Sequence, residues 1–275
     1  MKLNFETFFP TLKPAVENLV NIWPGYVIKA QFANWEVLHI LSLILLGGTA
    51  IIMNLRLIGV GLTEEPPSEV YRNLRRWQDA GVIGIVITGL LIGWANAERL
   101  YASTAFLVKI IALIAGIILT YGASRPAARA EGHVDGRAKL FLLVGLGLWL
   151  TGLWVFVTGT LIGPGLLHVL SAAVLIVLLL IQGRLRWVFA GGVASLLAAQ
   201  LLVAHGVPEF DLTKLDPINV GFAWAISAWT LGAALFQMFV VDRVNGSSPV
   251  TKLVGYASIL VWVTAAAAGR WIAFA

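Results

Sequence analysis

The chain has 275 residues, of which 59% are hydrophobic and only 12% charged, and its mean hydropathy is +0.87. A soluble domain carries about a quarter charged residues, so this composition excludes a soluble globular protein. The lack of cysteine excludes disulfides and thiolate metal sites. The net charge of +5 resides largely in short connections between apolar segments, which is a topology signal rather than a nucleic-acid-binding surface.

Residues 1–33 form a lead-in that we do not expect to cross the membrane. Within it, the segment Leu12–Trp23 places its apolar side chains on one helical face, which predicts a short helix lying on the outer membrane interface. An irregular lead-in fits equally well, because Pro14 lies within the segment and Pro10 and Pro24 flank it.

The rest of the chain contains continuous apolar runs long enough to cross a hydrocarbon core, which needs about 20 residues per helix. The runs lack the alternation of a membrane barrel, so they predict helices. The sequence therefore predicts an all-α integral membrane protein with eight transmembrane helices, at residues 35–57, 79–97, 105–123, 139–161, 165–183, 187–205, 219–241 and 252–272.

Arginine and lysine are distributed unevenly among the connections. The connections 1–2, 3–4, 5–6 and 7–8 hold most of the 19 basic residues, including Arg72, Arg125, Arg184 and Arg243. The positive-inside rule places these connections in the cytoplasm. We therefore predict a bacterial inner-membrane protein with both termini on the periplasmic side.

Two short phrases recur along the chain. Leu38–Ser42 reads LHILS and Leu167–Ser171 reads LHVLS, while Trp149–Gly152 is echoed by Trp262–Ala265. The order is the same in both halves, and an even number of helices per half makes a parallel repeat. We predict an N-terminal segment 1–33, a first four-helix repeat 34–161 and a second four-helix repeat 162–275.

Three of the four histidines map to the outer side of the predicted membrane. Helices 1 and 5 start outside, so His39 and His168 each lie about 6 Å below the outer boundary at 1.5 Å per residue. His205 ends helix 6 at the same boundary, whereas His133 lies in a predicted cytoplasmic loop. An ionisable residue inside a membrane is a functional-site candidate by default.

A pair of histidines at equal depth matches the needs of a low-spin haem b, which takes one neutral imidazole on each face. We predict that His39 and His168 hold one haem between the two repeats. Arg99 and Arg270, with Lys29, would pair with its propionates. Glu36, one turn before His39, would orient the imidazole or accept a proton beside a quinone site.

Other interpretations of these residues stay open. His39, His168 and His205 together would also suit zinc or copper, and Leu-His-x-Leu-Ser would serve as a helix-packing phrase with His–Ser hydrogen bonds. Gly145, Gly147 and Gly152 predict close helix packing. The tryptophans inside helices either pack in a core or line a cofactor or quinone cavity, and these are Trp149, Trp154 and Trp262.

Several motifs resemble an uncharacterised bacterial multi-pass membrane family. They are Glu36-x-x-His39, Gly47-Gly48, Asn54–Gly59 (NLRLIG), Thr88–Leu91 (TGLL), Ala105–Lys109 (AFLVK), Trp262 and the closing Gly269–Ala273. That family is similar in layout to copper-resistance-D-like and cytochrome-b-type membrane proteins, a resemblance that implies haem-binding helix histidines. This chain has Asn54 where many relatives have aspartate, and Trp94–Ala97 lacks the helix-2 histidine of some haem-binding relatives. The resemblance therefore implies no second haem in the first half.

These patterns favour a b-type cytochrome subunit rather than a stand-alone enzyme. It would transfer electrons between the quinone pool and a periplasmic redox protein such as a c-type cytochrome, through one outer-leaflet haem and within a larger complex. The alternatives are a metal-handling or transporter protein and a cofactor-free scaffold subunit. Few polar residues, mainly Thr88, Gln200 and Gln237, lie near the predicted midplane, which disfavours proton-coupled transport.

Overall fold

The computed structural model describes residues 3–159, 164–207, 211–241 and 248–274, and these residues are helical with no β-strand. Among them, seven helices are long and apolar enough to cross a membrane. An eighth, α10 (Pro164–Leu180), corresponds to the predicted fifth span but has 17 residues, the lower end of what a bilayer requires. The prediction of an all-helical protein is confirmed for the described residues, and seven of their helices have the length and composition of membrane spans.

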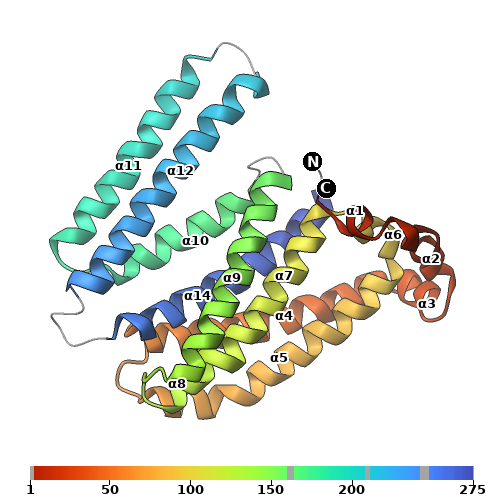
Figure 1. Ribbon diagram of the computed structural model, residues 1–275, viewed down its shortest axis with the longest axis horizontal. Coiled ribbons are helices and arrows are strands. Elements are labelled where there is room, and N and C mark those ends of the chain that lie inside the picture. Colours follow the sequence, from red (N-terminus) through yellow and green to blue (C-terminus); the bar gives the residue numbers. More distant parts are fainter. Residues whose placement is uncertain (1–2, 160–163, 208–210, 242–247, 275) are drawn as a thin grey trace. The chain divides into compact units, whose positions relative to one another are not determined.

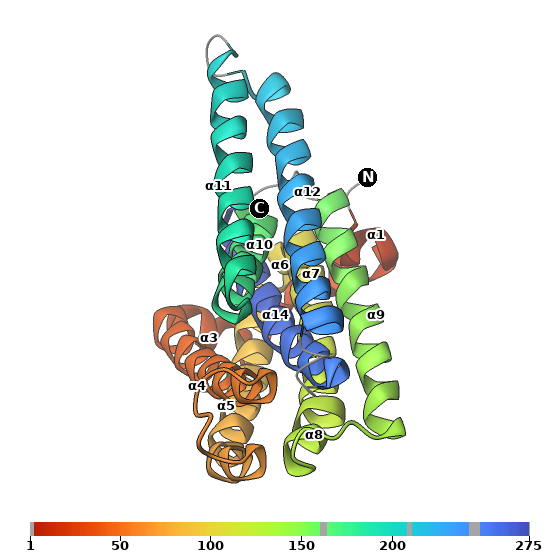
Figure 2. The same cartoon turned by 90° about the vertical axis from the view of Figure 1, so that its left-hand side faces the viewer.

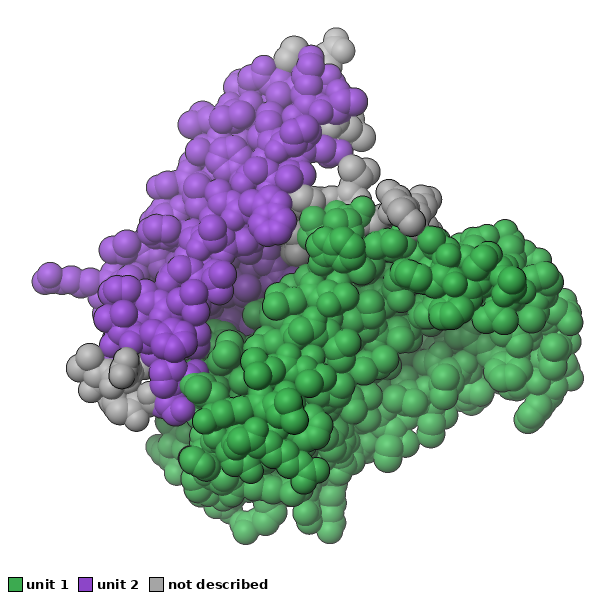
Figure 3. Space-filling model, in the orientation of Figure 1, with its two compact units in different colours: residues 1–160, 250–275 green, residues 161–249 purple. Residues whose placement is uncertain are grey.

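The chain divides into two compact units, which are coloured separately in Figure 3. Unit 1 contains residues 1–160 and 250–275, and unit 2 contains residues 161–249. These units do not follow the predicted repeats, because the last helix belongs to unit 1. Compactness and internal repetition are different properties, so the repeat remains a prediction.

Unit 1 is built from two helical hairpins and the last helix (Figures 1 and 2). In the first hairpin α4 (Phe32–Ile58) packs along α5 (Pro67–Ala95), and in the second α7 (Thr104–Ile118) packs along α9 (Gly136–Gly159). Helix α14 (Pro249–Trp271) contacts α4 through Gly255, α7 through Trp262 and α9 through Thr264. The core of unit 1 therefore lies where α14 meets both hairpins.

Helix α4 ends at a glycine, Gly59. Gly59 has φ +94°, a left-handed conformation that favours glycine, and its N–H bonds back to Leu55 and Arg56. After the turn, α5 begins at Pro67, since proline suits the first helical position, and the extended Pro66 is its N-cap residue. Helix α5 thus starts about three turns before the predicted span at residue 79, because its arginine-rich first turns are helical but too polar to register as a membrane span.

The α4–α5 packing depends on glycines that let the two backbones approach. A Cβ atom at Gly81 would lie 2.6 Å from the Leu46 nitrogen and one at Gly84 would lie 2.4 Å from the Ser42 Oγ. On α9, Gly145 and Gly152 approach α7 and its continuation in the same way, as predicted. Gly147 does not, because a Cβ there would meet no atom within 4 Å.

Helix α7 continues through a π-helical segment, Leu119–Ser124, into α8 (Arg125–Arg129). Trp262 is buried and donates its indole N–H to Thr120 Oγ1 at 3.1 Å, and Trp149 donates to Thr264 Oγ1 at 2.8 Å. Trp154 instead is exposed. The three internal tryptophans therefore differ: Trp149 and Trp262 pack in the core, and Trp262 also lines a cavity in unit 1.

The N-terminal segment has several short pieces rather than the single helix predicted for Leu12–Trp23. They are α1 (Phe5–Phe8), a 3₁₀ turn (Pro10–Leu12), α2 (Lys13–Asn18), a second 3₁₀ turn (Leu19–Asn21) and α3 (Gly25–Ala30). Two hydrogen bonds attach this segment to the end of unit 1 where α6 (Ala97–Tyr101) connects α5 and α7. The Asn4 amide donates to Ala102 O, and the Trp94 indole N–H donates to Leu19 O.

Unit 2 contains α10, α11 (Arg184–His205) and α12 (Leu212–Phe236), which continues into a π-helical segment at Gln237–Val241. Helices α11 and α12 lie side by side (Figures 1 and 2), and Gly192 of α11 receives the Trp229 ring of α12. The Trp229 indole N–H donates to Phe189 O at 3.1 Å. Unit 2 is thus a hairpin with one further helix.

Candidate functional site

A cavity of about 630 Å³ opens in unit 1 between α4, α5, α7 and α14, with the N-terminal segment at one end. Most of its wall is apolar, including Leu43, Ile85, Leu113 and Trp262. Its polar lining groups include His39 of α4 and Lys109 of α7. A largely apolar pocket with a few convergent polar groups is the usual form of a small-molecule site.

The tautomer of His39 follows from its hydrogen bonds. Thr88 Oγ1 lies 2.6 Å from Gly84 O, which can only accept, so the hydroxyl proton is donated there. The same Oγ1 lies 2.8 Å from His39 Nδ1 and must therefore accept from an Nδ1–H group. In the neutral imidazole this arrangement leaves the lone pair on Nε2.

Lys109 donates a hydrogen bond to the Nε2 lone pair of His39. Its Nζ lies 3.1 Å from His39 Nε2, and an ammonium can only donate. Helix α7 starts at Thr104 behind the N-cap Ser103, whose Oγ accepts from Phe106 N–H. This start places Lys109 in the second turn of the helix, at the level of His39.

Two glycines leave room for the pair. A Cβ at Gly89 of α5 would lie 3.3 Å from His39 Cε1. A Cβ at Gly269 of α14 would lie 3.5 Å from Lys109 Cδ, Cε and Nζ. Each side chain therefore packs against the backbone of a neighbouring helix, which restricts where its nitrogen points.

The pocket contains three of the site residues predicted from the sequence: His39, Glu36 and Arg270. Glu36 and Arg270 are exposed at its rim, while His39 is partly buried. Arg99 is not among the lining residues, and its guanidinium donates to Ile272 O at 2.9 Å. Lys29 likewise bonds Asn96 Oδ1, at 2.6 Å.

Sequence reasoning missed Lys109 as a site residue, since it named this lysine only as the end of the Ala105–Lys109 motif. A signal was available, because a lysine inside an apolar span is costly unless it has a partner. Its predicted depth, near the outer end of helix 3, matches that of His39. What the sequence lacked was the information that α4 and α7 face one cavity.

The two other outer histidines belong to unit 2. His205 is exposed and is the last residue of α11. His168 lies on α10, but its side chain falls outside the described residues. Within the described part of the chain, no group of three or more His, Asp or Glu side chains is arranged to hold a metal ion. The predicted pairing of His39 with His168 therefore stays a prediction.

The pocket is open to apolar surroundings. Ile40 and Leu90 line it and are 49% and 69% exposed. On membrane-crossing helices such side chains face acyl chains. At the other end Phe5, Val16 and Leu19 line the pocket, and Leu19 is held by the Trp94 indole N–H at 3.0 Å. A ligand with an apolar body therefore has a route from the lipid.

Comparison with known proteins identifies a family for this chain. The model of a family described as "Family of unknown function (DUF6644)" matches residues 22–165, which is more than half of the chain. No curated protein and no solved structure matches. The matched segment contains His39, Thr88 and Lys109, so most of the polar end of the pocket lies within it. The chain belongs to the DUF6644 family.

Proposed function

We propose that this chain is a bacterial inner-membrane electron-transfer subunit, with periplasmic termini, whose unit 1 binds a quinone or quinol in the His39 pocket. The observation that carries the proposal is the hydrogen-bonded pair of His39 Nε2 and Lys109 Nζ, 3.1 Å apart, in a largely apolar cavity of about 630 Å³. A quinone combines a flat apolar ring and tail with carbonyl oxygens that accept hydrogen bonds. The Lys109 ammonium supplies such a donor.

The same pair can handle protons. Oxidation of a quinol releases two protons and two electrons. When the Lys109 ammonium turns to a ligand oxygen, the Nε2 lone pair of His39 becomes free to accept one proton. Glu36, exposed at the rim, is placed to accept the second. The electrons would pass to the periplasmic redox protein that we propose as partner, of the c-type cytochrome class.

Haem b is a second candidate, and the tautomer of His39 favours it. A ligating histidine usually donates its other ring N–H to an oxygen, as Nδ1–H does to Thr88. Lys109 Nζ, however, occupies the position in front of Nε2 where an iron would bind. The described residues therefore do not fit a haem at His39 unless Lys109 moves. A haem would supply one-electron transfer.

The quinone proposal predicts saturable binding that depends on Lys109. We expect decylubiquinone to quench the tryptophan fluorescence of the protein in lipid nanodiscs, because Trp94 and Trp262 line the pocket. Lys109→Met should weaken binding about 10–150-fold, since a hydrogen bond from a charged group contributes about 1.5–3 kcal/mol. The matched control Lys139→Met, at an exposed lysine of α9, should bind as the wild type does. Absence of saturable quenching, or wild-type affinity in Lys109→Met, would disprove the proposal.

Haem and metal candidates are separated by spectroscopy of the purified protein. If haem b is bound, the reduced-minus-oxidised spectrum shows a b-type alpha band that His39→Leu abolishes and His133→Ala, at an exposed loop histidine, preserves. A spectrum without that band ends the haem proposal. Stoichiometric copper or zinc without iron would instead favour the metal-handling function.

A further inference from the structure

The first turns of α5 carry arginines and a tryptophan next to a charge-free membrane segment. The stretch from Ala80 to Ala95 contains no charged residue, and it is about 24 Å long at 1.5 Å per residue. A hydrocarbon core is about 30 Å thick, so Arg75, Arg76 and Trp77 lie at the boundary where headgroups begin. Trp77 is 59% exposed, as expected of a tryptophan in an interfacial belt.

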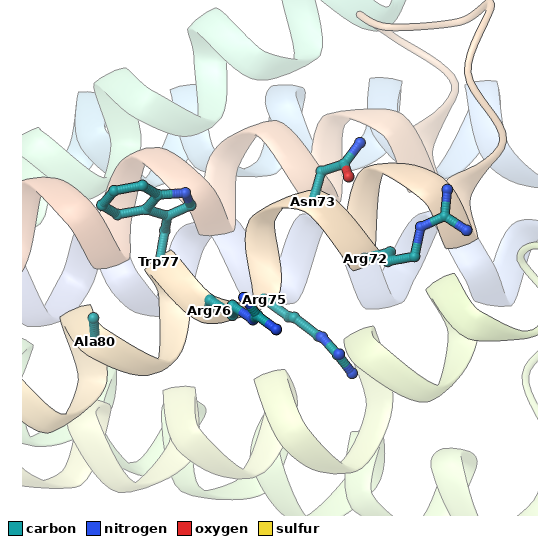
Figure 4. A pocket seen from close by; sticks show the side chains of 6 residues that line it. All are labelled: Arg72, Asn73, Arg75, Arg76, Trp77 and Ala80. Carbon is teal, nitrogen blue, oxygen red and sulfur yellow. The ribbon is translucent and has the colours of Figure 1, made fainter.

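These residues line an open hollow of about 700 Å³ (Figure 4). Figure 4 shows that all the lining side chains project from successive turns of the same helix, and they are Arg72, Asn73, Arg75, Arg76, Trp77 and Ala80. The lining includes three arginines and no carboxylate. The hollow is therefore strongly positive and complementary to an anion.

The nearby carboxylates do not cancel this charge. Asp79 interacts electrostatically with Arg75, but its main basic partner is Arg125, because its Oδ1 lies 2.7 Å from the Arg125 guanidinium and accepts the Tyr121 hydroxyl at 2.7 Å. Glu69 lies 2.9 Å from Arg72, but both side chains are exposed, so that pair is weak. Arg76 makes no hydrogen bond or ion pair with any described residue.

We propose that this hollow binds the phosphate of an anionic phospholipid headgroup, in the leaflet on the arginine-rich side of the membrane. Guanidinium groups match phosphate oxygens in a two-pronged geometry. The Trp77 ring lies at the level where headgroups meet acyl chains. A lipid is favoured over a soluble anion because its phosphate is held at this depth by its own chains, whereas a free ion would have to be captured by exposed arginines alone.

The test compares lipids of different charge. Native mass spectrometry of the full chain in detergent, titrated with dioleoylphosphatidylglycerol or dioleoylphosphatidylcholine, should show a preferred phosphatidylglycerol adduct. The double variant Arg75→Gln/Arg76→Gln should lose at least tenfold of that preference. The matched control Arg137→Gln/Lys139→Gln removes the same charge from the first turn of α9, and we expect it to retain the preference.

Three outcomes would overturn the proposal. The first is equal binding of the two lipids by the wild type. The second is an equal loss in the control, which would show a general charge effect. The third is full displacement of phosphatidylglycerol by millimolar inorganic phosphate, which would show a site for soluble anions. Melting temperatures verify that each variant is folded, and Arg76→Lys, which keeps the charge but not the planar fork, should bind at an intermediate level.

Discussion

Replacing Gly81 by valine is expected to prevent the α4–α5 hairpin from packing. A Cβ at this position would lie 2.6 Å from the nitrogen and 2.8 Å from the Cα of Leu46. These are backbone atoms of a long helix and cannot rotate away, so the two helices would have to separate. Overpacking commonly costs about 1–3 kcal/mol, and with a rigid backbone as the obstacle we expect the top of that range or beyond.

The measurement is thermal unfolding in detergent together with size-exclusion chromatography. Gly81→Val should lower the melting temperature strongly or yield aggregated protein. Gly48→Val is the matched control, because a Cβ at Gly48 on the partner helix would meet no atom within 4 Å. If both variants melt like the wild type, the close approach of α4 and α5 described above is wrong.

Replacing Asp79 by asparagine is expected to destabilise unit 1 more than replacing its partner Arg125. The Arg125 side chain is 6% exposed and that of Asp79 is 43% exposed. Arg125 also donates from Nε to Gln78 Oε1 at 2.8 Å and stacks 4.0 Å from the Tyr121 ring centroid. Asp79→Asn would therefore leave a buried guanidinium without its counter-ion, a change that typically costs about 3–5 kcal/mol.

Arg125→Met leaves a carboxylate that water can still reach. We expect a cost of about 1–3 kcal/mol, the range for leaving a buried acceptor, here Gln78 Oε1, without its donor. In Asp79→Asn/Arg125→Met the stranded charge is absent, so the double variant should be about as stable as Arg125→Met alone. A double-mutant cycle of unfolding free energies measures this coupling. Equal losses in the two single variants would show that the ion pair is not asymmetric in burial.

The candidate site was only half predictable from the sequence. His39 was identifiable because a histidine in an apolar span is rare and costly, and Glu36 and Arg270 followed from their places near the outer helix ends. Lys109 was equally unusual, but its role in the site depends on a contact between α4 and α7. The two residues in contact, His39 and Lys109, are 70 positions apart in the sequence. Thr88 looked like one of a few midplane polar residues, and its hydrogen bonds assign the tautomer of His39.

The local sequence likewise predicted the helices better than it predicted how they pack. Gly145 and Gly152 make the close approaches that their type favours, while Gly147 meets no neighbour. Trp149 and Trp262 pack inward and Trp154 is exposed, although all three lie inside apolar helices. A glycine or tryptophan in a membrane helix indicates which contacts that face of the helix could make. Whether a contact forms depends on the position of the neighbouring helix.

The sequence by itself determined that this protein is a bundle of membrane-crossing helices, because a backbone in lipid must satisfy its hydrogen bonds within each apolar segment. It also showed which apolar segments contain a histidine. The tertiary structure alone decided that α14 packs with the first half of the chain, that Thr88 bonds His39, and that His39 and Lys109 line one cavity. Such contacts join residues distant in sequence, and hydropathy carries no information about which faces of two apolar helices touch.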